Sequence, residues 1–256
     1  MKNPLISALG LVIATLPATG ASLVGLWEFS NPGNIGQATV GADLVVAGTA
    51  PAYSASLADD AANSQSGVIT TNLGVGNHLV ATNPIGGNGG GALTNQYSLL
   101  IDMQSPLGSR GTWRSLYQTN PANTGDGDLF IRNSDTGVGV GTIGYSPTIN
   151  DTVWNRYVIT FDAGSPVTAY LNGSLLHTHG ASSVDDRFGL NTTFLLFGDE
   201  DNENNSMNVG TIAFWNGALS STEVAALGIA GSPVPEPAGA LLLILAGTAG
   251  IARRRR

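Results

Sequence analysis

The stretch from Thr152 to Gly180 reads TVWNRYVITFDAGSPVTAYLNGSLLHTHG, and its pattern predicts a β-sheet protein. Two runs rich in β-branched and aromatic residues, RYVITF and VTAYL, flank the turn-forming residues AGSP. Asn172-Gly173 then stands between two apolar runs, which is the strongest short-range signal for a β-hairpin. The stretch therefore predicts consecutive strands joined by tight turns.

The same punctuation continues on both sides of this stretch. Short apolar runs such as SLVGLWEFS, QYSLLIDMQ and TFLLFGDE alternate with Gly, Asn, Asp and Pro at intervals of about ten residues. Only SSTEVAALG predicts a short helix, which Ser220 or Ser221 can cap and Gly228 can end. Residues 22–232 are therefore expected to form one all-β antiparallel sandwich.

Composition restricts the chemistry of this domain. The chain has no cysteine, which excludes thiol redox catalysis and cysteine-based zinc sites. Between Ser22 and Pro233 there are seventeen acidic residues and five arginines. Such a surface repels nucleic acid and anionic lipid, so we expect no nucleic-acid partner. It suits cations and neutral glycans, although a need for solubility would also explain the charge.

The two ends of the chain predict export. Lys2, an apolar stretch and small residues from Ala18 to Ser22 describe a secretory signal peptide over residues 1–21, in the form of a helix. The C-terminal residues 233–256 begin with the rigid element Pro235-Glu236-Pro237. A mainly apolar run, residues 238–252, follows as a predicted transmembrane helix, although a bilayer span needs about 20 residues.

Four arginines, Arg253, Arg254, Arg255 and Arg256, close the chain and predict a cationic stop on the cytoplasmic side. An ordinary tail anchor is one interpretation. The order of Pro-Glu-Pro, apolar helix and arginine cluster closely resembles the PEP-CTERM sorting signal of Gram-negative bacteria. The resemblance implies processing by an exosortase at the Pro-Glu-Pro element. It also implies a transient inner-membrane anchor and a final place at the cell surface or outside the cell, in a host that secretes exopolysaccharide.

A second resemblance covers most of the chain, from about Leu23 to Gly228. Trp154, an apolar strand that ends near Asp162, and AYLNG are similar to the laminin-G-like, concanavalin-A-like jelly roll. GLWEFSN matches the first strand of that family, and IAFWNGALSSTEVAALG matches its last strand and closing helix. The resemblance implies two antiparallel sheets packed face to face. This fold hosts lectins, glycosidases and adhesive modules alike.

The polar segment GDEDNENNSMN, residues 198–208, is the strongest candidate site. Asp199, Asp201, Glu203 and Asn205 could converge on a calcium ion, which takes six to eight oxygen ligands. The alternative is a solvated acidic turn. The segment lacks the EF-hand glycine and glutamate, and Gly210 stands roughly where the laminin-G-like family often has an aspartate.

A catalytic role for the same residues requires a strand that presents two carboxylates, as in a retaining glycosidase. Glu200 and Asn202 would then have to pack into the core, so the segment is expected to be a loop. His177 and His179 share one strand face but lack a clear third metal ligand. No catalytic residue is therefore assigned.

Other polar and aromatic positions have simpler expectations. Asp126 and Asp128 are expected to form a hairpin turn, with cation binding as the alternative. The pairs Asp59-Asp60 and Asp185-Asp186 are expected to be solvated. The four tryptophans could stack on sugar rings, but each lies in a strand-like run where core packing is the commoner fate. This expectation is weakest for Trp113, between Thr112 and Arg114.

These features favour an exported, non-catalytic module that binds a polysaccharide or another component of the cell envelope. The alternative is a secreted glycan hydrolase or lyase on the same fold. A purely structural role in the extracellular matrix would leave the same sequence pattern.

The calcium hypothesis predicts that millimolar Ca²⁺ raises the melting temperature. A ligand that binds only the folded state adds about 2.7 kcal/mol of stability at a hundredfold excess over its Kd. Asp201→Ala should abolish this gain in thermal unfolding experiments. A rise no larger than that in NaCl of equal ionic strength would exclude the site.

Overall fold

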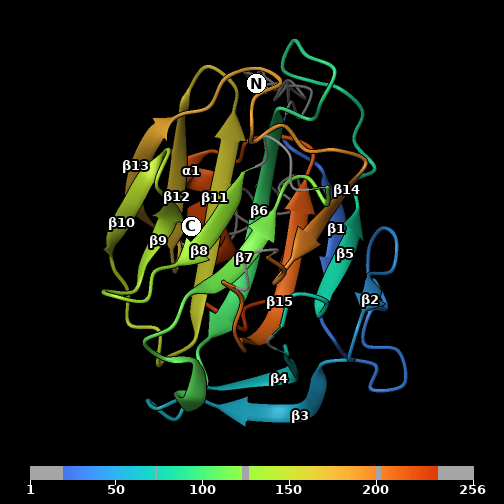
Figure 1. Ribbon diagram of the computed structural model, residues 1–256, viewed down its shortest axis with the longest axis vertical. Helices are drawn as coiled ribbons and strands as arrows, with labels where there is room; N and C mark the ends of the chain where they lie inside the picture. Colours follow the sequence, from blue (N-terminus) through green and yellow to red (C-terminus); the bar gives the residue numbers. More distant parts are fainter. Residues whose placement is uncertain (1–19, 73, 123–126, 200–202, 236–256) are drawn as a thin grey trace, which may run out of the picture.

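Two antiparallel β-sheets lie face to face in the computed structural model, which describes residues 20–72, 74–122, 127–199 and 203–235 (Figure 1). Every strand pair in these residues is antiparallel, as the sequence predicts for a jelly-roll sandwich. The eight-stranded sheet has the order β13 (Ser174–Ala181), β12 (Pro166–Leu171), β11 (Asn155–Asp162), β6 (Gln96–Gln104), β15 (Asn208–Trp215), β4 (Ser64–Thr70) and β3 (Ala52–Ala58), with β1 (Leu23–Trp27) also paired to β15. The seven-stranded sheet has the order β10 (Gly144–Thr148), β9 (Gly137–Val140), β8 (Asp128–Ile131), β7 (Arg114–Gln118), β14 (Thr193–Leu196), β5 (His78–Thr82) and β2 (Val45–Ala47).

The stretch quoted first forms β11, β12 and β13, three consecutive strands at one end of the eight-stranded sheet. Asn172 and Gly173 connect β12 to β13 with φ angles of +50° and +79°. Positive φ at both central residues is the geometry of the tight hairpin turn that Asn-Gly favours. The predicted hairpin is therefore confirmed.

Apolar side chains cover both faces of the eight-stranded sheet at its centre. In β6, Leu99 and Ile101 belong to the core between the sheets, whereas Leu100 belongs to a second apolar cluster with Val224 and Leu227. Those two residues come from α1 (Ser221–Leu227), which therefore packs against the outer face of this sheet. Because strand side chains alternate between faces, a central strand covered on both sides is apolar throughout.

The predicted helix is confirmed, and its ends follow its sequence. Ser220 and Glu223 form a capping box, in which each side chain bonds to the backbone of the other residue. Gly228 ends the helix with a φ of +73°. A 3₁₀ turn, η1 (Leu107–Ser109), lies between β6 and β7.

A buried ion pair joins β6 to β11. Asp102 and Arg156 are register partners with 0% exposure of both side chains. Arg156 Nε donates to Asp102 Oδ1 at 2.8 Å, and Nη2 donates to Oδ2 at 2.7 Å. The remaining capacity of the pair is used by the residues that follow α1.

We call residues 228–235 the strap. Arg156 Nη2 donates to the carbonyl of Ser232 at 2.7 Å, and Nη1 donates to the carbonyl of Leu227 at 2.5 Å. The backbone N–H of Gly231 donates to Asp102 Oδ2 at 3.0 Å. Val234 then packs against the second apolar cluster. The ion pair therefore fixes the course of the strap across the outer face of the eight-stranded sheet.

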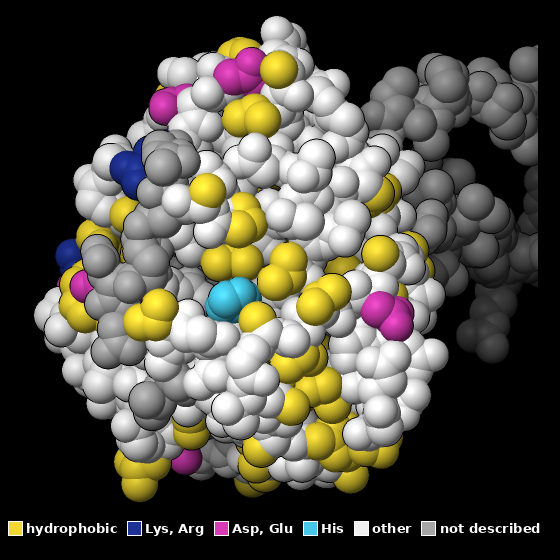
Figure 2. Space-filling model, turned by 45° about the vertical axis from the view of Figure 1, so that its right-hand side comes forward, with side chains coloured by type: hydrophobic (Ala, Val, Ile, Leu, Met, Phe, Trp, Pro, Cys, Tyr) yellow, Lys and Arg dark blue, Asp and Glu magenta, His cyan; other side chains and the backbone are white. Residues whose placement is uncertain are grey.

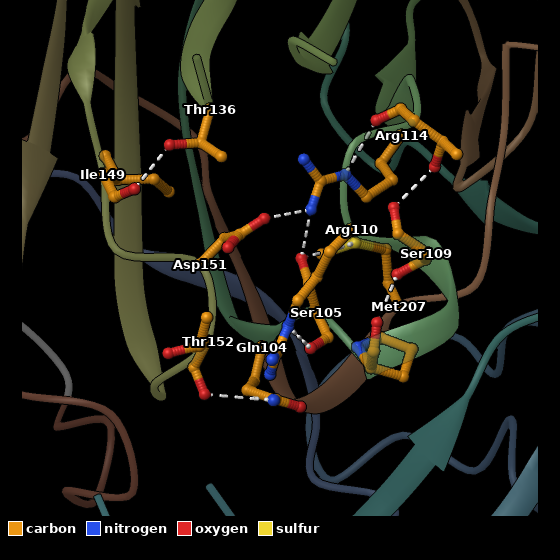
Figure 3. Close-up of polar contacts among 12 residues, drawn as sticks. Gln104, Ser105, Ser109, Arg110, Arg114, Thr136, Ile149, Asp151, Thr152 and Met207 are labelled. Atoms are coloured by element: carbon orange, nitrogen blue, oxygen red, sulfur yellow. Dashed lines mark hydrogen bonds and ion pairs between the residues drawn. The ribbon is translucent and has the colours of Figure 1, made fainter. Parts of the chain in front are cut away.

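A second buried ion pair connects the two sheets (Figure 3). Arg114 of β7 donates through Nη1 to Asp151, which precedes β11, and to the Ser105 hydroxyl at 2.6 Å. Its Nε donates to the carbonyl of Thr112 at 3.1 Å. The Ser105 N–H donates to the carbonyl of Asp151 at 2.8 Å, so the end of β6 belongs to the same network.

The expectation that Asp59 is solvated is wrong. Asp59 is buried, and its carboxylate accepts hydrogen bonds from the backbone N–H groups of Ala61, Asn63 and Trp154. Asp185 is exposed, as expected, but its carboxylate accepts from the N–H groups of Ala92 and Leu93 at 2.8 Å each. A short carboxylate side chain can accept hydrogen bonds from loop N–H groups in this way. Several of these partners lie more than 90 residues apart, so the sequence does not reveal the contacts.

Within the described residues, no helix is both long enough and apolar enough to cross a membrane. The predicted signal helix, apart from its last residues, and the predicted transmembrane helix over residues 238–252 lie outside the described residues.

We predict that Arg156→Leu lowers the free energy of unfolding by about 3–5 kcal/mol, because it leaves the Asp102 carboxylate buried without its cation. Urea unfolding followed by circular dichroism measures this loss. The double variant Arg156→Leu, Asp102→Leu should recover part of it, since no unpaired charge is then buried. Equal stability of Arg156→Leu and the wild type would contradict this role of the pair.

Candidate functional site

The outer face of the seven-stranded sheet carries a group of aromatic side chains. In β8, Leu129 and Ile131 belong to the core between the sheets, so Phe130 between them points outward. Ser115 of β7 pairs with Phe130, and Trp113 lies two residues before Ser115 on the same side. The register of β7 and β8 therefore brings Trp113 and Phe130 together on this face.

We call Trp113, Phe130 and Tyr145 the aromatic cluster. The rings of Trp113 and Phe130 meet edge to face with centroids 5.9 Å apart. The centroid of Tyr145, from β10, lies 6.2 Å from that of Trp113. Phe130 is buried under this arrangement, whereas Trp113 and Tyr145 are partly exposed. The cluster therefore presents two amphipathic rings to solvent on a supporting phenylalanine.

A charged pair borders the cluster. The guanidinium carbon of Arg132 lies 4.3 Å from the centroid of the Tyr145 ring, within the range of a cation–π interaction. Arg132 Nε also donates to Asp135 Oδ1 at 2.7 Å, and Nη2 pairs with Oδ2. The planar fork of Arg132 is thereby fixed beside the rings.

The pKa of Tyr145 is also affected by a carboxylate from another segment of the chain. Burial raises the pKa of Tyr145, the Arg132 cation opposes that rise, and the carboxylates of Glu203 and Asp135 add to it. The phenol is therefore protonated at neutral pH and can both donate and accept a hydrogen bond. Glu203 belongs to the acidic segment for which the sequence predicts calcium.

This acidic segment adjoins β7, since the Ser115 hydroxyl donates to the carbonyl of Gly198 at 2.6 Å. Asp199 is buried, and its Oδ2 accepts from the Glu203 N–H at 2.6 Å. Asn204 is held by Gly74, whose N–H donates to Asn204 Oδ1 at 3.1 Å. Residues 198, 199 and 203–207 lie between β14 and β15 and belong to no strand, as expected for a loop, and Asn208 begins β15.

The calcium set is only partly described. Asp199, Glu203 and Asn205 are placed, and Asn205 Oδ1 accepts from the Ser206 N–H at 2.8 Å, but Asp201 lies outside the described residues. Among the residues with a described placement, no group of three or more histidines and acidic residues could hold a metal. Asp201 lies outside those residues, so the calcium site stays a prediction.

The two neighbouring histidines lie where β13 of one sheet contacts β10 of the other. The rings of His177 and His179 in β13 meet at 4.7 Å, and His179 Nδ1 lies 3.1 Å from the carbonyl of Gly144 in β10. Burial, together with the charge of His177, lowers the pKa of His179 to about 4. His179 is therefore neutral at physiological pH.

The tryptophans divide as expected. Trp27, Trp154 and Trp215 are buried, which confirms core packing for these three. Trp113, for which that expectation is weakest, is the partly exposed one. Nothing in the sequence pairs it with Phe130, Arg132 or Tyr145, because their proximity depends on strand register.

An apolar row continues this face across the sheet. Val45, Val80 and Leu195 are cross-strand partners in β2, β5 and β14, and Val45 is 61% exposed. Figure 2 shows hydrophobic side chains gathered around a histidine on the side of the molecule where these strands lie in Figure 1. The outer face thus combines apolar surface with the aromatic cluster.

Residues 92–225, more than half of the chain, match the family model described as the concanavalin A-like lectin/glucanases superfamily. The chain belongs to this superfamily, which confirms the resemblance to the laminin-G-like jelly roll. No curated protein sequence matches the chain.

Several solved structures share the fold at low sequence identity. The ligand-binding domain of botulinum neurotoxin serotype D, in complex with N-acetylneuraminic acid, is 15% identical with a TM-score of 0.53, over 80% of this chain and 50% of that chain. Trypanosoma rangeli sialidase is 17% identical with a TM-score of 0.54, over 82% and 32%. Domain 4 of an extracellular arabinanase from Geobacillus stearothermophilus, in complex with arabinotriose, is 16% identical with a TM-score of 0.53, over 82% and 99%.

The chain spans about half the length of the neurotoxin binding domains that it matches. At these identities the likeness shows the fold. The chemistry of the site has to come from its own residues.

Proposed function

We propose that this protein is a non-catalytic carbohydrate-binding module and that the aromatic cluster is its binding surface. The observation that carries the proposal is the partly exposed pair of Trp113 and Tyr145 on the outer sheet face. The C–H faces of a sugar ring are apolar and bury surface against an aromatic ring. Two such rings held by a buried phenylalanine form a preorganised stacking surface.

Polar groups at the edge of the cluster supply hydrogen bonds for sugar hydroxyls. The Tyr145 phenol donates and accepts, and the Arg132 guanidinium donates from a fixed position beside Asp135. Sugar binding commonly combines apolar surface with a few oriented polar groups. This cluster has both.

The relatives support the class of ligand. The superfamily is named for lectins and glucanases, and two proteins of the same fold are complexes with N-acetylneuraminic acid and with arabinotriose. The acidic surface of this chain disfavours an acidic sugar such as the first. We therefore expect a neutral glycan.

The environment of Asp199 supports a non-catalytic role. A glycosidase needs carboxylates that face the scissile bond from both sides. Asp199 is buried, and its Oδ2 accepts from the backbone of Glu203. Asp199 is therefore turned into its own loop rather than toward a ligand.

We further propose that the protein is exported with the signal peptide of residues 1–21 and sorted by an exosortase through residues 233–256. The support is the order of Pro235-Glu236-Pro237, the apolar run and the four arginines. A transient inner-membrane anchor would then precede release to the cell surface or the surrounding matrix. Calcium, if bound by Asp199, Asp201, Glu203 and Asn205, would offset the repulsion between the carboxylates of this segment.

Trp113→Ala should weaken glycan binding at least tenfold, which corresponds to about 1.4 kcal/mol of lost stacking. A glycan array probed with the full chain identifies the ligand, and isothermal titration calorimetry measures the change. Leu175→Ala is the control, because Leu175 is 62% exposed and is the cross-strand partner of Tyr170, which belongs to the second apolar cluster on the outer face of the eight-stranded sheet. Unchanged affinity of a folded Trp113→Ala variant would exclude the cluster as the site.

Changing Glu236 to Gln should block processing and leave a longer, membrane-anchored precursor, which immunoblots of cell fractions would detect. Replacing Arg253 to Arg256 with Ser should disturb the topology of the tail. The sorting proposal would fail if a variant without residues 233–256 reached the same location with the same mature mass.

A further inference from the structure

Two hollows flank the strap on the eight-stranded sheet, away from the aromatic cluster. One has a volume of about 580 Å³ and the other about 410 Å³. Gln65 of β4, with Gly231 and Ser232 of the strap, lines both of them. The two hollows therefore meet at Gln65 and form one elongated site.

The amide of Gln65 is the most informative feature of this site. The residue is only 6% exposed, and its side chain makes no hydrogen bond to a described residue. Neither amide atom is among the buried side-chain atoms that lack a partner, so the amide reaches the surface of the hollows, where water can bond to it. A ligand in the hollows can take the place of that water and bond to both amide groups.

The strap lies directly against this amide. Gly231 has a φ of +83°, which favours glycine, and a Cβ atom added there would lie 2.6 Å from Gln65 Nε2. The ion pair of Asp102 and Arg156 holds Gly231 and Ser232 in place, so the wall of the site is rigid before any ligand arrives.

The lining is uncharged over the larger hollow and rich in groups that both donate and accept. Asn63, Ser64 and Asn172 lie there, with the buried Trp154 and backbone of the strap. Asn172 Oδ1 accepts from the N–H of Arg156, and its Nδ2 can donate to a ligand.

The smaller hollow adds the hydroxyls of Ser30, Tyr53, Ser66 and Thr211. Its one carboxylate, Glu28, already accepts from the Thr39 hydroxyl at 2.8 Å. Among the described residues, neither hollow is lined by a lysine, arginine or histidine that would attract an anion, and Glu28 is the one carboxylate that could bind a metal ion.

We infer that the two hollows beside the strap form a second binding site, for a neutral saccharide chain, with Gln65 at its centre. Sugar hydroxyls donate and accept at the same atom, which matches amide and hydroxyl groups that do the same. The partly exposed Tyr53 offers an aromatic ring to a sugar in the smaller hollow. The site shares no residue with the aromatic cluster, so the chain would bind glycans on both of its faces.

Gln65→Met tests the site, because methionine keeps the shape of the side chain and removes its hydrogen bonds. Isothermal titration calorimetry of the full chain with neutral xylo-, cello- and arabino-oligosaccharides should show about tenfold weaker binding at one of two sites. The melting temperature should stay about equal, because the amide makes no hydrogen bond to a described residue that the substitution could break. Gln37→Met is the matched control, because Gln37 is exposed and lies outside both hollows.

The outcomes separate this site from the aromatic cluster. In Trp113→Ala the strap site should still bind, with half the stoichiometry of the wild type. Equal binding by Gln65→Met and the wild type overturns the strap site and leaves the aromatic cluster untouched. Binding of uncharged peptides, lost in the same variant without any binding of oligosaccharides, would overturn it in favour of a peptide ligand.

Discussion

The ion pair between Asp102 and Arg156 is the interaction on which the rest of the structure depends. Burial costs each ion several kcal/mol of hydration free energy, so the pair is stable only when hydrogen bonds satisfy both side chains. The chain supplies this with two side-chain bonds and with backbone groups of Leu227, Gly231 and Ser232. The ion pair thereby joins β6 to β11, binds the C-terminal end of α1 and holds the strap against the sheet.

This arrangement gives the two sheets different roles. The eight-stranded sheet has apolar side chains on both faces, because α1 and the strap cover its outer side. The outer side of the seven-stranded sheet is also packed at its centre, where Ser115 and Phe130 are buried. Trp113 and Tyr145 keep exposed surface on this side and are available to a ligand. The aromatic cluster and the polar hollows beside the strap therefore lie on opposite sheets.

Local patterns in the sequence predict the elements well. Asn172-Gly173 predicts its hairpin because positive φ at both positions is a property of these two residues. The ends of α1 are likewise predicted by single residues. Ser220 and Glu223 cap its start with their side chains, and Gly228, which has no side chain, allows the positive φ at its end. Asp199 and Glu203 are correctly expected outside a strand, since polar residues at alternating positions do not suit a strand that packs on a core.

Contacts between distant residues are a different matter. Asp102 and Arg156 are 54 residues apart, and their pairing depends on the register of β6 and β11. The aromatic cluster depends on the pairing of β7 with β8, which shifts between Ser115 and Tyr117, and no pattern in the sequence announces that irregularity. The importance of Gln65 depends on a strap that no periodicity predicts.

The central claim is that a glycan rests on Trp113. Of the four tryptophans, the other three are buried, so a collisional quencher such as acrylamide reaches mainly Trp113. Quenching of tryptophan fluorescence in the full chain should therefore fall sharply when a bound oligosaccharide covers that ring. Undiminished quenching at saturating oligosaccharide would show that the sugar binds elsewhere and would contradict the account.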